Sequence, residues 1–239
     1  EERIAERIDA NLLGISMEDL HMLNKKLFNE KIVKLQSKTT GTLIIKEYPT
    51  ASASVNHYRA LVNELALKRT FKPDLIFVDY INICASSRFK PGSNVNSYTY
   101  VKAIAEEMRG LAVELDVPIV TATQTTRSGF VSSDIGLEDT SESFGLPATA
   151  DFMFALISSE ELERAGQMLV KQLKNRYNDP TVNRKFIIGV DRARMRLFDI
   201  EQQAQNLIQP EQEKYVEHNL EKTEESPEEK YKKFQDFKF

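Results

Sequence analysis

The sequence predicts an α/β fold with a mostly parallel sheet that helices cover, and with β-hairpins added toward the carboxyl end. Two short apolar runs, residues 74–80 and 117–124, lie on either side of a long amphipathic stretch. Such alternation of strand and helix implies right-handed crossovers between parallel strands. Beyond Ala150 the chain becomes rich in β-prone residues separated by turns, which favours hairpins at one edge of the sheet. These runs are residues 151–157, 168–176 and 185–200.

The first part of the chain predicts helices on both sides of one strand. Apolar residues at helical spacing predict a helix that stops near Gly14, and Ser16 with Asp19 resembles a capping box for a second helix. Residues 42–48 predict a strand, and residues 52–70 predict a further helix. The apolar positions of the three helices are Ile4, Ala5, Ile8 and Leu12, then Leu20, Leu23, Leu27 and Phe28, then Tyr58, Leu61, Val62 and Leu65.

Residues 74–80 carry the first candidate site residue. Four consecutive apolar residues, two of them β-branched, predict a strand buried on both faces, as in a parallel sheet covered by helices. The run ends near Asp79, and ligands of open α/β sheets bind at the carboxyl ends of strands. A carboxylate there can hold Mg²⁺ against nucleotide phosphates, directly or through water. The alternative is an aspartate that only caps the next element.

A long helix and a second strand follow. Ser97 is the expected cap of a helix whose apolar residues fall at 101, 104, 105, 108, 111, 112 and 115, a strongly amphipathic spacing. Residues 117–124 then predict a short strand that ends at Gln124. An amide at that point can orient the attacking water or contact a terminal phosphate, and so switch the loop that follows. The alternative is a glutamine that merely begins a loop.

Residues 168–176 predict a strand with two cations on one face. Because side chains alternate along a strand, Lys174 and Arg176 lie on the same side as Val170 and Gln172. Next to the turn at residues 177–180, they fit an arginine-finger arrangement aimed at the nucleotide of a neighbouring subunit. The alternative is a solvated basic edge that blunts an exposed strand.

The order of these segments resembles a known family. The stretches LIFVDYINI, TATQTTRSG, DTSESFGLPATADFMFAL and KNRYNDP together resemble the RecA-like motor domain of DnaB-type hexameric replicative helicases. The phrase GLPATADFM is most similar to the group found in T-even-type phages. The resemblance covers about residues 1–200. It implies a three-layer RecA-like P-loop NTPase core that uses ATP and Mg²⁺ to translocate on single-stranded DNA and unwind duplex at the replication fork.

The same resemblance implies roles and partners. Asp79 would organise Mg²⁺, Gln124 would sense the γ-phosphate, and Lys174 with Arg176 would complete the nucleotide site of the neighbouring subunit. The implied partners are single-stranded DNA, further copies of the chain in a homo-hexamer, a primase and a helicase loader. Two alternatives stay open from the residues: a RecA-like recombinase ATPase, and a non-catalytic RecA-like adaptor.

The chain departs from the family at the phosphate-binding loop. No G-x-x-x-x-G-K-[S/T] sequence occurs in its 239 residues. The family places that loop, its strand and a strand ending in a catalytic glutamate upstream of the point where this chain starts. Residues 1–8 resemble the helix that follows the second of those strands. We therefore expect the carboxyl-terminal part of a motor domain that lacks the P-loop strand, either a fragment or one half of a split protein, and inactive in isolation.

The polar segments after Gln124 are candidates for DNA contact. In the family, two loops of this region line the central pore and contact single-stranded DNA. The residues that fall on them here are Arg127, Ser128, Ser141, Glu142 and Ser143. The chain departs from the family at Ser141, where many members carry arginine. The alternative is an ordinary surface loop.

Composition and charge fit a protein of this class. The net charge of −4 equals the surplus of ten acidic residues over six lysines in residues 201–239, so residues 1–200 balance to zero. A strongly basic footprint for duplex DNA is therefore absent. The single cysteine, Cys84, is expected to be a small core residue in a reducing cytoplasm. No apolar run approaches the length that crosses a bilayer.

The chain divides into two expected regions. Residues 1–200 form the motor domain, and residues 201–239 form an acidic tail that we expect to be disordered. The tail ends in spaced aromatic residues, Phe234, Phe237 and Phe239. They suit either a docking peptide for a partner or a segment that folds back on its own domain.

Overall fold

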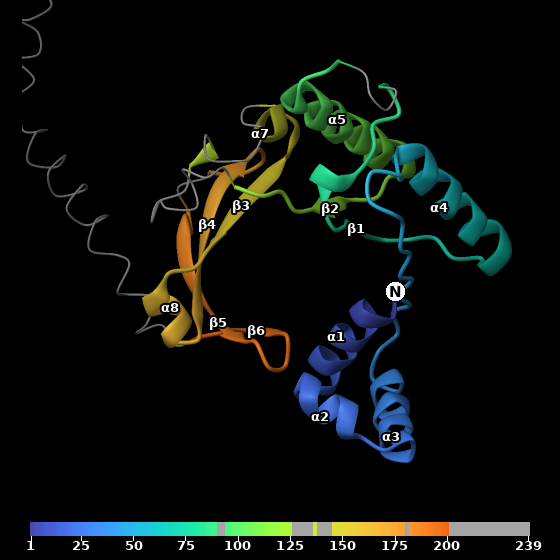
Figure 1. The fold of residues 1–239 in the computed structure, drawn as a ribbon, viewed down its shortest axis with the longest axis vertical. Helices are drawn as coiled ribbons and strands as arrows, with labels where there is room; N and C mark the ends of the chain where they lie inside the picture. Colours follow the sequence, from blue (N-terminus) through green and yellow to red (C-terminus); the bar gives the residue numbers. More distant parts are fainter. Residues whose placement is uncertain (90–93, 126–135, 138–144, 180–181, 201–239) are drawn as a thin grey trace, which may run out of the picture.

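The computed structural model describes residues 1–89, 94–125, 136–137, 145–179 and 182–200 (Figure 1). The described part is a mixed α/β fold, as the sequence predicts. Its helices are α1 (Glu2–Leu13), α2 (Met17–Met22), α3 (Lys25–Gln36), α4 (Val55–Arg69), the short 3-10 turn η1 (Ile81–Ile83), α5 (Ser97–Leu115), α7 (Gly145–Thr149) and α8 (Glu160–Arg164). Its strands are β1 (Ile76–Val78), β2 (Ile119–Thr121), β3 (Phe152–Ile157), β4 (Gln167–Asn175), β5 (Lys185–Asp191) and β6 (Arg196–Asp199).

The described strands form two sheets. Strands β1 and β2 pair in parallel, with Ile76 opposite Ile119 and Val78 opposite Thr121. Strands β3, β4, β5 and β6 pair in chain order as an antiparallel meander. The predicted hairpins after Ala150 are therefore confirmed. The described strands do not form the predicted, mostly parallel sheet, because four of the six belong to the antiparallel sheet.

Residues 42–48 do not form the predicted strand. They lack regular secondary structure, although their composition favours a strand. A strand needs a neighbour to accept its ladder hydrogen bonds, and no described strand pairs with this segment. Local propensity favours a strand here, but the tertiary partner that would complete it is missing from the described residues.

The core lies between the parallel sheet and two helices. Helix α5 buries Val101, Ile104, Met108 and Leu111 along the predicted apolar stripe. They pack with residues from α4, η1 and α7, and Val78 and Ile119 contact the same cluster from the sheet. The amino-terminal cap of α5 is Asn96, whose side chain accepts a hydrogen bond from the Thr99 amide, and not Ser97 as predicted.

The two faces of the parallel sheet differ in burial among the described residues. Phe77 and Val120 lie opposite each other in the β1–β2 register and share the face that points away from this core. Phe77 is 70% exposed and Val120 is 43% exposed. The sequence predicted β1 as buried on both faces, and the described residues cover one face only.

The amino-terminal helices sit beside the turn between β5 and β6. The predicted second helix is divided into α2 and α3, because Asn24 caps a new helix by accepting a hydrogen bond from the Leu27 amide. The Asn11 side chain donates to the Met195 carbonyl at 2.6 Å, and the Met17 amide donates to the Ala193 carbonyl at 3.0 Å. These bonds join the two ends of the described chain.

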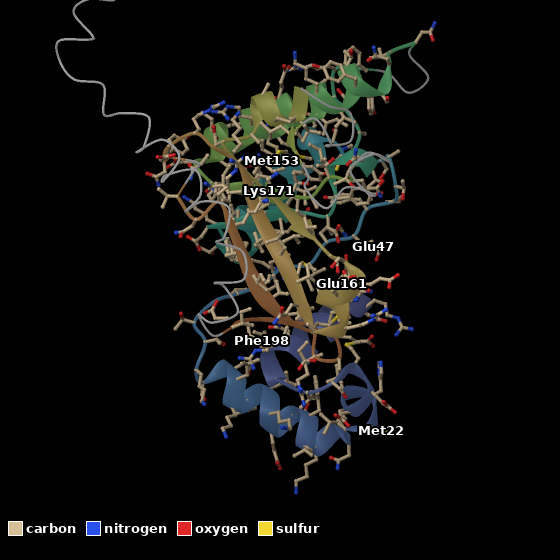
Figure 2. All side chains as sticks on the ribbon, turned by 90° about the vertical axis from the view of Figure 1, so that its left-hand side faces the viewer. Met22, Glu47, Met153, Glu161, Lys171 and Phe198 are labelled. Carbon is tan, nitrogen blue, oxygen red and sulfur yellow. The ribbon has the colours of Figure 1, made fainter. Side chains whose placement is uncertain are left out.

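The antiparallel sheet has a small core of its own, centred on Ala155 and Ile157. At the end of the sheet where β6 lies, Phe198 (labelled in Figure 2) pairs with Gly189 on β5, and its ring covers that glycine. A Cβ atom at position 189 would lie 2.4 Å from that ring, so any other residue there would push the Phe198 ring aside. Among the described helices, none has the length and apolar content needed to span a membrane.

Candidate functional site

The carboxyl ends of β1 and β2 meet at one edge of the parallel sheet, and the segments that follow them are bonded together. The Ile81 amide donates to the Ala122 carbonyl at 3.2 Å. The Thr123 hydroxyl donates to the Asn82 side-chain oxygen at 2.9 Å. Parallel pairing brings both strand ends to the same edge, and these cross-links hold the two connecting segments side by side.

Asp79 and Gln124 lie on these two bonded segments. The Gln124 side-chain amide donates to the Tyr80 hydroxyl at 3.1 Å, so it sits next to the residue that follows Asp79. Both Asp79 and Gln124 are exposed. The Asp79 carboxylate has no hydrogen bond or ion pair to another side chain in the described part of the structure. The two residues therefore lie at the same sheet edge, and their chemical roles stay predictions.

The chemistry of Asp79 fits a magnesium ion that is shared with phosphates. Mg²⁺ in nucleotide sites is held by one or two protein carboxylates, with water and phosphate oxygens filling the remaining positions. An exposed carboxylate at a strand end, without a cation of its own among the described residues, suits that arrangement. The same residues contain no group of three or more His, Cys, Asp or Glu side chains that would form a metal site by themselves.

Lys174 and Arg176 form a second group, at the carboxyl end of β4. The Lys174 ammonium donates to the Pro147 carbonyl in α7 and reaches the Ala148 carbonyl at 3.4 Å. The Arg176 guanidinium donates to the Ala148 carbonyl at 3.3 Å. Burial and the nearby Arg176 charge lower the pKa of Lys174. Lys174 is partly buried and Arg176 is exposed, so the solvated basic edge and the role between subunits both stay open.

Asp151 completes this second group. Its Oδ1 atom lies 2.7 Å from Nη1 of Arg176 and 2.7 Å from Nη1 of Arg109. Arg109 comes from α5 and also donates to the Thr149 carbonyl at 2.8 Å. The hydrogen bond to Asp151 raises the pKa of Arg109. Neither Asp151 nor Arg109 was predicted from the sequence, because a pair 42 residues apart leaves no local pattern.

The predicted site residues thus fall into two separate groups. In the described structure, no hydrogen bond or ion pair joins Asp79 or Gln124 to Lys174 or Arg176. The predicted DNA-binding residues lie outside the described residues: Arg127, Ser128, Ser141, Glu142 and Ser143.

A buried carboxylate, Glu107, holds the segment that leaves η1. The Ser87 hydroxyl and amide donate to Glu107 at 2.6 Å and 2.8 Å, and the Ser86 hydroxyl donates to its other oxygen. Burial opposes ionisation of Glu107, but the serine hydrogen bonds outweigh it and lower its pKa. Glu107 was not singled out from the sequence, although an acid on the buried side of a helix was a usable signal.

An apolar groove of about 280 Å³ runs beside β1. Residues from 42–50, from α4 and from 75–79 line it. Cys84 also borders the groove and is buried, so the predicted core position of this cysteine is confirmed. Burial raises the pKa of its thiol.

Comparison with known proteins gives consistent matches. A family model described as the DnaB-like helicase C-terminal domain matches residues 1–228. The DnaB-like replicative helicase of Enterobacteria phage T4 is 47% identical over 205 residues, which are 84% of this chain and 43% of the phage protein. A probable plasmid replicative DNA helicase of Chlamydia muridarum is 32% identical over 128 residues, 52% of this chain and 26% of that protein.

Two solved structures share the fold. One is a DnaB-like replicative helicase studied with its interactions with primase, with a TM-score of 0.64 and 17% identity over 82% of this chain and 47% of that chain. The other is an ATPase domain, with a TM-score of 0.65 and 16% identity over 82% of this chain and 69% of that one. The chain spans less than half the length of the curated proteins that it matches.

Proposed function

This chain belongs to the family of DnaB-like helicase C-terminal domains, and we propose that it is the carboxyl-terminal part of an ATP-dependent replicative DNA helicase. One observation carries the proposal beyond family membership. Asp79 and Gln124 lie on two bonded segments at the carboxyl edge of a parallel sheet, where such folds bind ligands. The complete motor would be a three-layer RecA-like P-loop NTPase core.

In this proposal the first group works on the nucleotide of its own subunit. Asp79 would hold Mg²⁺, and the bound ion would neutralise negative charge on the phosphates. Gln124 contacts the γ-phosphate or its attacking water and changes position with nucleotide state. One N–H of the Gln124 amide donates to the Tyr80 hydroxyl, and the second N–H of that amide would be the donor for a phosphate oxygen.

The second group works on the nucleotide of the adjacent subunit. Lys174 and Arg176 would bring positive charge to the γ-phosphoryl group as negative charge develops there. Lys174 lies on β4 and Arg176 directly follows that strand, and the resemblance to the helicase family supports a role for both between subunits of a homo-hexamer. Arginine suits this role because its guanidinium stays charged and presents several N–H donors in a fixed plane.

Hydrolysis around the ring would move the pore loops along single-stranded DNA and separate the duplex. Arg127 and Ser128 on the first loop, and Ser141, Glu142 and Ser143 on the second, are the proposed DNA contacts. A solved structure of a DnaB-like replicative helicase describes interactions with primase, which supports a primase as a partner here. A helicase loader is proposed from the family resemblance alone.

The proposal is tested by mixing two inactive variants of the complete protein that contains this chain. Arg176→Ala should lower ATP hydrolysis by roughly 10³-fold or more, since arginine fingers contribute on that scale, while nucleotide binding stays nearly intact. Asp79→Ala should be inactive because its own subunit cannot hold Mg²⁺. Mixed rings contain interfaces at which an intact Asp79 site meets an intact Arg176, so mixing should restore part of the activity.

The mixing ratio provides the control. Restored activity should depend on the ratio of the two variants and reach its maximum when both are abundant, whereas either variant alone should stay inactive. If every mixture stays inactive while both variants assemble into mixed hexamers, Arg176 does not act on the neighbouring subunit and this part of the proposal is wrong.

A further inference from the structure

We propose that Asp151 is a positioning residue that holds Arg176 in the orientation needed for the neighbouring nucleotide. This inference rests on the proposed function and adds a residue that the sequence did not single out. Asp151 lies at the bend between α7 and β3, directly beside the end of β4. It would act through Arg176 and would not itself touch the nucleotide.

The contacts fix Arg176 from three directions. Its backbone amide donates to the Asp151 carbonyl at 2.9 Å, which holds the main chain. Its Nη1 atom lies 2.7 Å from the Asp151 carboxylate, and its Nη2 atom donates to the Ala148 carbonyl at 3.3 Å. A guanidinium carries five N–H donors in a plane. The remaining donors stay available for phosphate oxygens while the plane itself is held.

The charges around Asp151 make the carboxylate necessary. Arg109, Lys174 and Arg176 bring three positive charges to one small region, and Asp151 is the carboxylate that two of them contact. Burial together with these positive neighbours lowers the pKa of Lys174. Without the negative charge of Asp151, the two arginines would repel each other across the same space. Arg109 lies within α5, whereas Arg176 follows the end of β4. We therefore expect the Arg176 side chain to move away from Arg109.

The support beneath Asp151 is rigid. Leu146 of α7 belongs to the main core and is 6% exposed. Gly145 packs so closely on α5 that a Cβ atom there would lie 2.9 Å from Cβ of Lys102. Arg109 approaches Asp151 from the same helix, α5. The segment that holds Arg176 is therefore anchored to the main core. Strand β1, which precedes Asp79, packs on the same core. This shared core links the two groups of site residues within one subunit.

The test is a double-mutant cycle in the complete protein. Asp151→Asn keeps the size of the side chain and removes its charge. It should lower kcat for ATP hydrolysis by about 10²-fold, the scale on which small misplacements act, with KM changed less than about twofold. In a protein that already carries Arg176→Ala, the same Asp151→Asn change should have no further effect, because Asp151 acts only through Arg176. Asp151→Glu should restore part of kcat.

Mixed rings provide the readout that a purely structural role would not move. Asp151→Asn subunits keep an intact Asp79 site, so mixing them with Asp79→Ala subunits should restore activity as Arg176→Ala subunits do. If Asp151→Asn lowers activity by the same factor whether residue 176 is arginine or alanine, the inference is overturned and the role of Asp151 is structural. An unchanged kcat in Asp151→Asn, with Arg176→Ala inactive, would overturn the inference and leave the proposed function standing. An active Arg176→Ala protein would overturn both.

Discussion

The two faces of the β1–β2 sheet differ in what they contact. One face lies against the core shared with α4 and α5, where Val78 and Ile119 pack with residues that include Ile104 and Leu111. The other face carries Phe77, which is 70% exposed. Both faces are formed by the same short apolar strands. Apolar content alone therefore does not determine burial, which depends on whether another element lies against that face.

The candidate site lies on the boundary between these two environments. Asp79 follows β1 directly and also borders the apolar groove beside that strand. Its position is fixed from the covered side, through the bonds between the segments after β1 and β2. The open side leaves the carboxylate exposed. A rigid support below and an accessible surface above are what a ligand site at a strand end requires.

The largest expected loss of stability comes from removing a buried side chain in the core beneath the covered face of the β1–β2 sheet. Leu111 on α5 is 1% exposed, and Leu111→Ala should lower the free energy of unfolding by about 2–5 kcal/mol through lost burial and a residual cavity. Val113 on the same helix is 76% exposed. Val113→Ala should therefore change the free energy of unfolding by less than about 0.5 kcal/mol. Urea titrations of both variants measure the difference. Equal losses would show that α5 is not packed as described.

A smaller loss of stability is expected at Glu107, which binds Ser86 and Ser87 in the segment after η1. Glu107→Gln should cost about 2 kcal/mol at pH 7, since it weakens hydrogen bonds to a charged acceptor. The folded-state pKa of Glu107 is lowered, because the serine hydrogen bonds outweigh the opposing effect of burial. Its contribution is therefore complete above the ordinary pKa of glutamate and is lost as the pH falls through the lowered value.

The pH dependence separates this role from simple packing. The stability difference between the native chain and Glu107→Gln, measured with denaturant, should shrink as the pH falls from 7 to below the ordinary pKa of glutamate. Glu106→Gln is the matched control, because Glu106 pairs with Arg88 in an exposed ion pair worth at most about 1 kcal/mol. A difference that stays constant with pH would contradict the charged hydrogen-bond network.

The smallest effect on stability is expected at the open face. Phe77→Ser removes a large exposed apolar side chain and should change the free energy of unfolding by less than about 0.5 kcal/mol. It should, however, reduce self-association of the isolated chain, because exposed apolar patches promote contact between molecules. Sedimentation velocity across a concentration series measures this. A large loss of stability would instead show that Phe77 is covered in solution.

Regular patterns made part of this structure predictable. The apolar stripe of α5 identified its buried residues because a helix repeats every 3.6 residues. Asp79 and Gln124 were each predicted at a strand end, and parallel strands end at one edge. The strand predicted at residues 42–48 failed because strands depend on partners that local sequence does not specify. The Arg109–Asp151 pair could not be predicted, since its members come from different elements and share no local signal.

Turnover by the purified 239-residue chain is the most direct test of how the catalytic parts are divided. In our proposal these residues supply the Mg²⁺-binding carboxylate and the finger arginine, while the phosphate-binding loop is not among them. ATP hydrolysis by this chain should be indistinguishable from that of its Asp79→Ala variant, at background level. Hydrolysis above background that Asp79→Ala abolishes would contradict the proposal, because the chain would then hold a complete catalytic site without a phosphate loop.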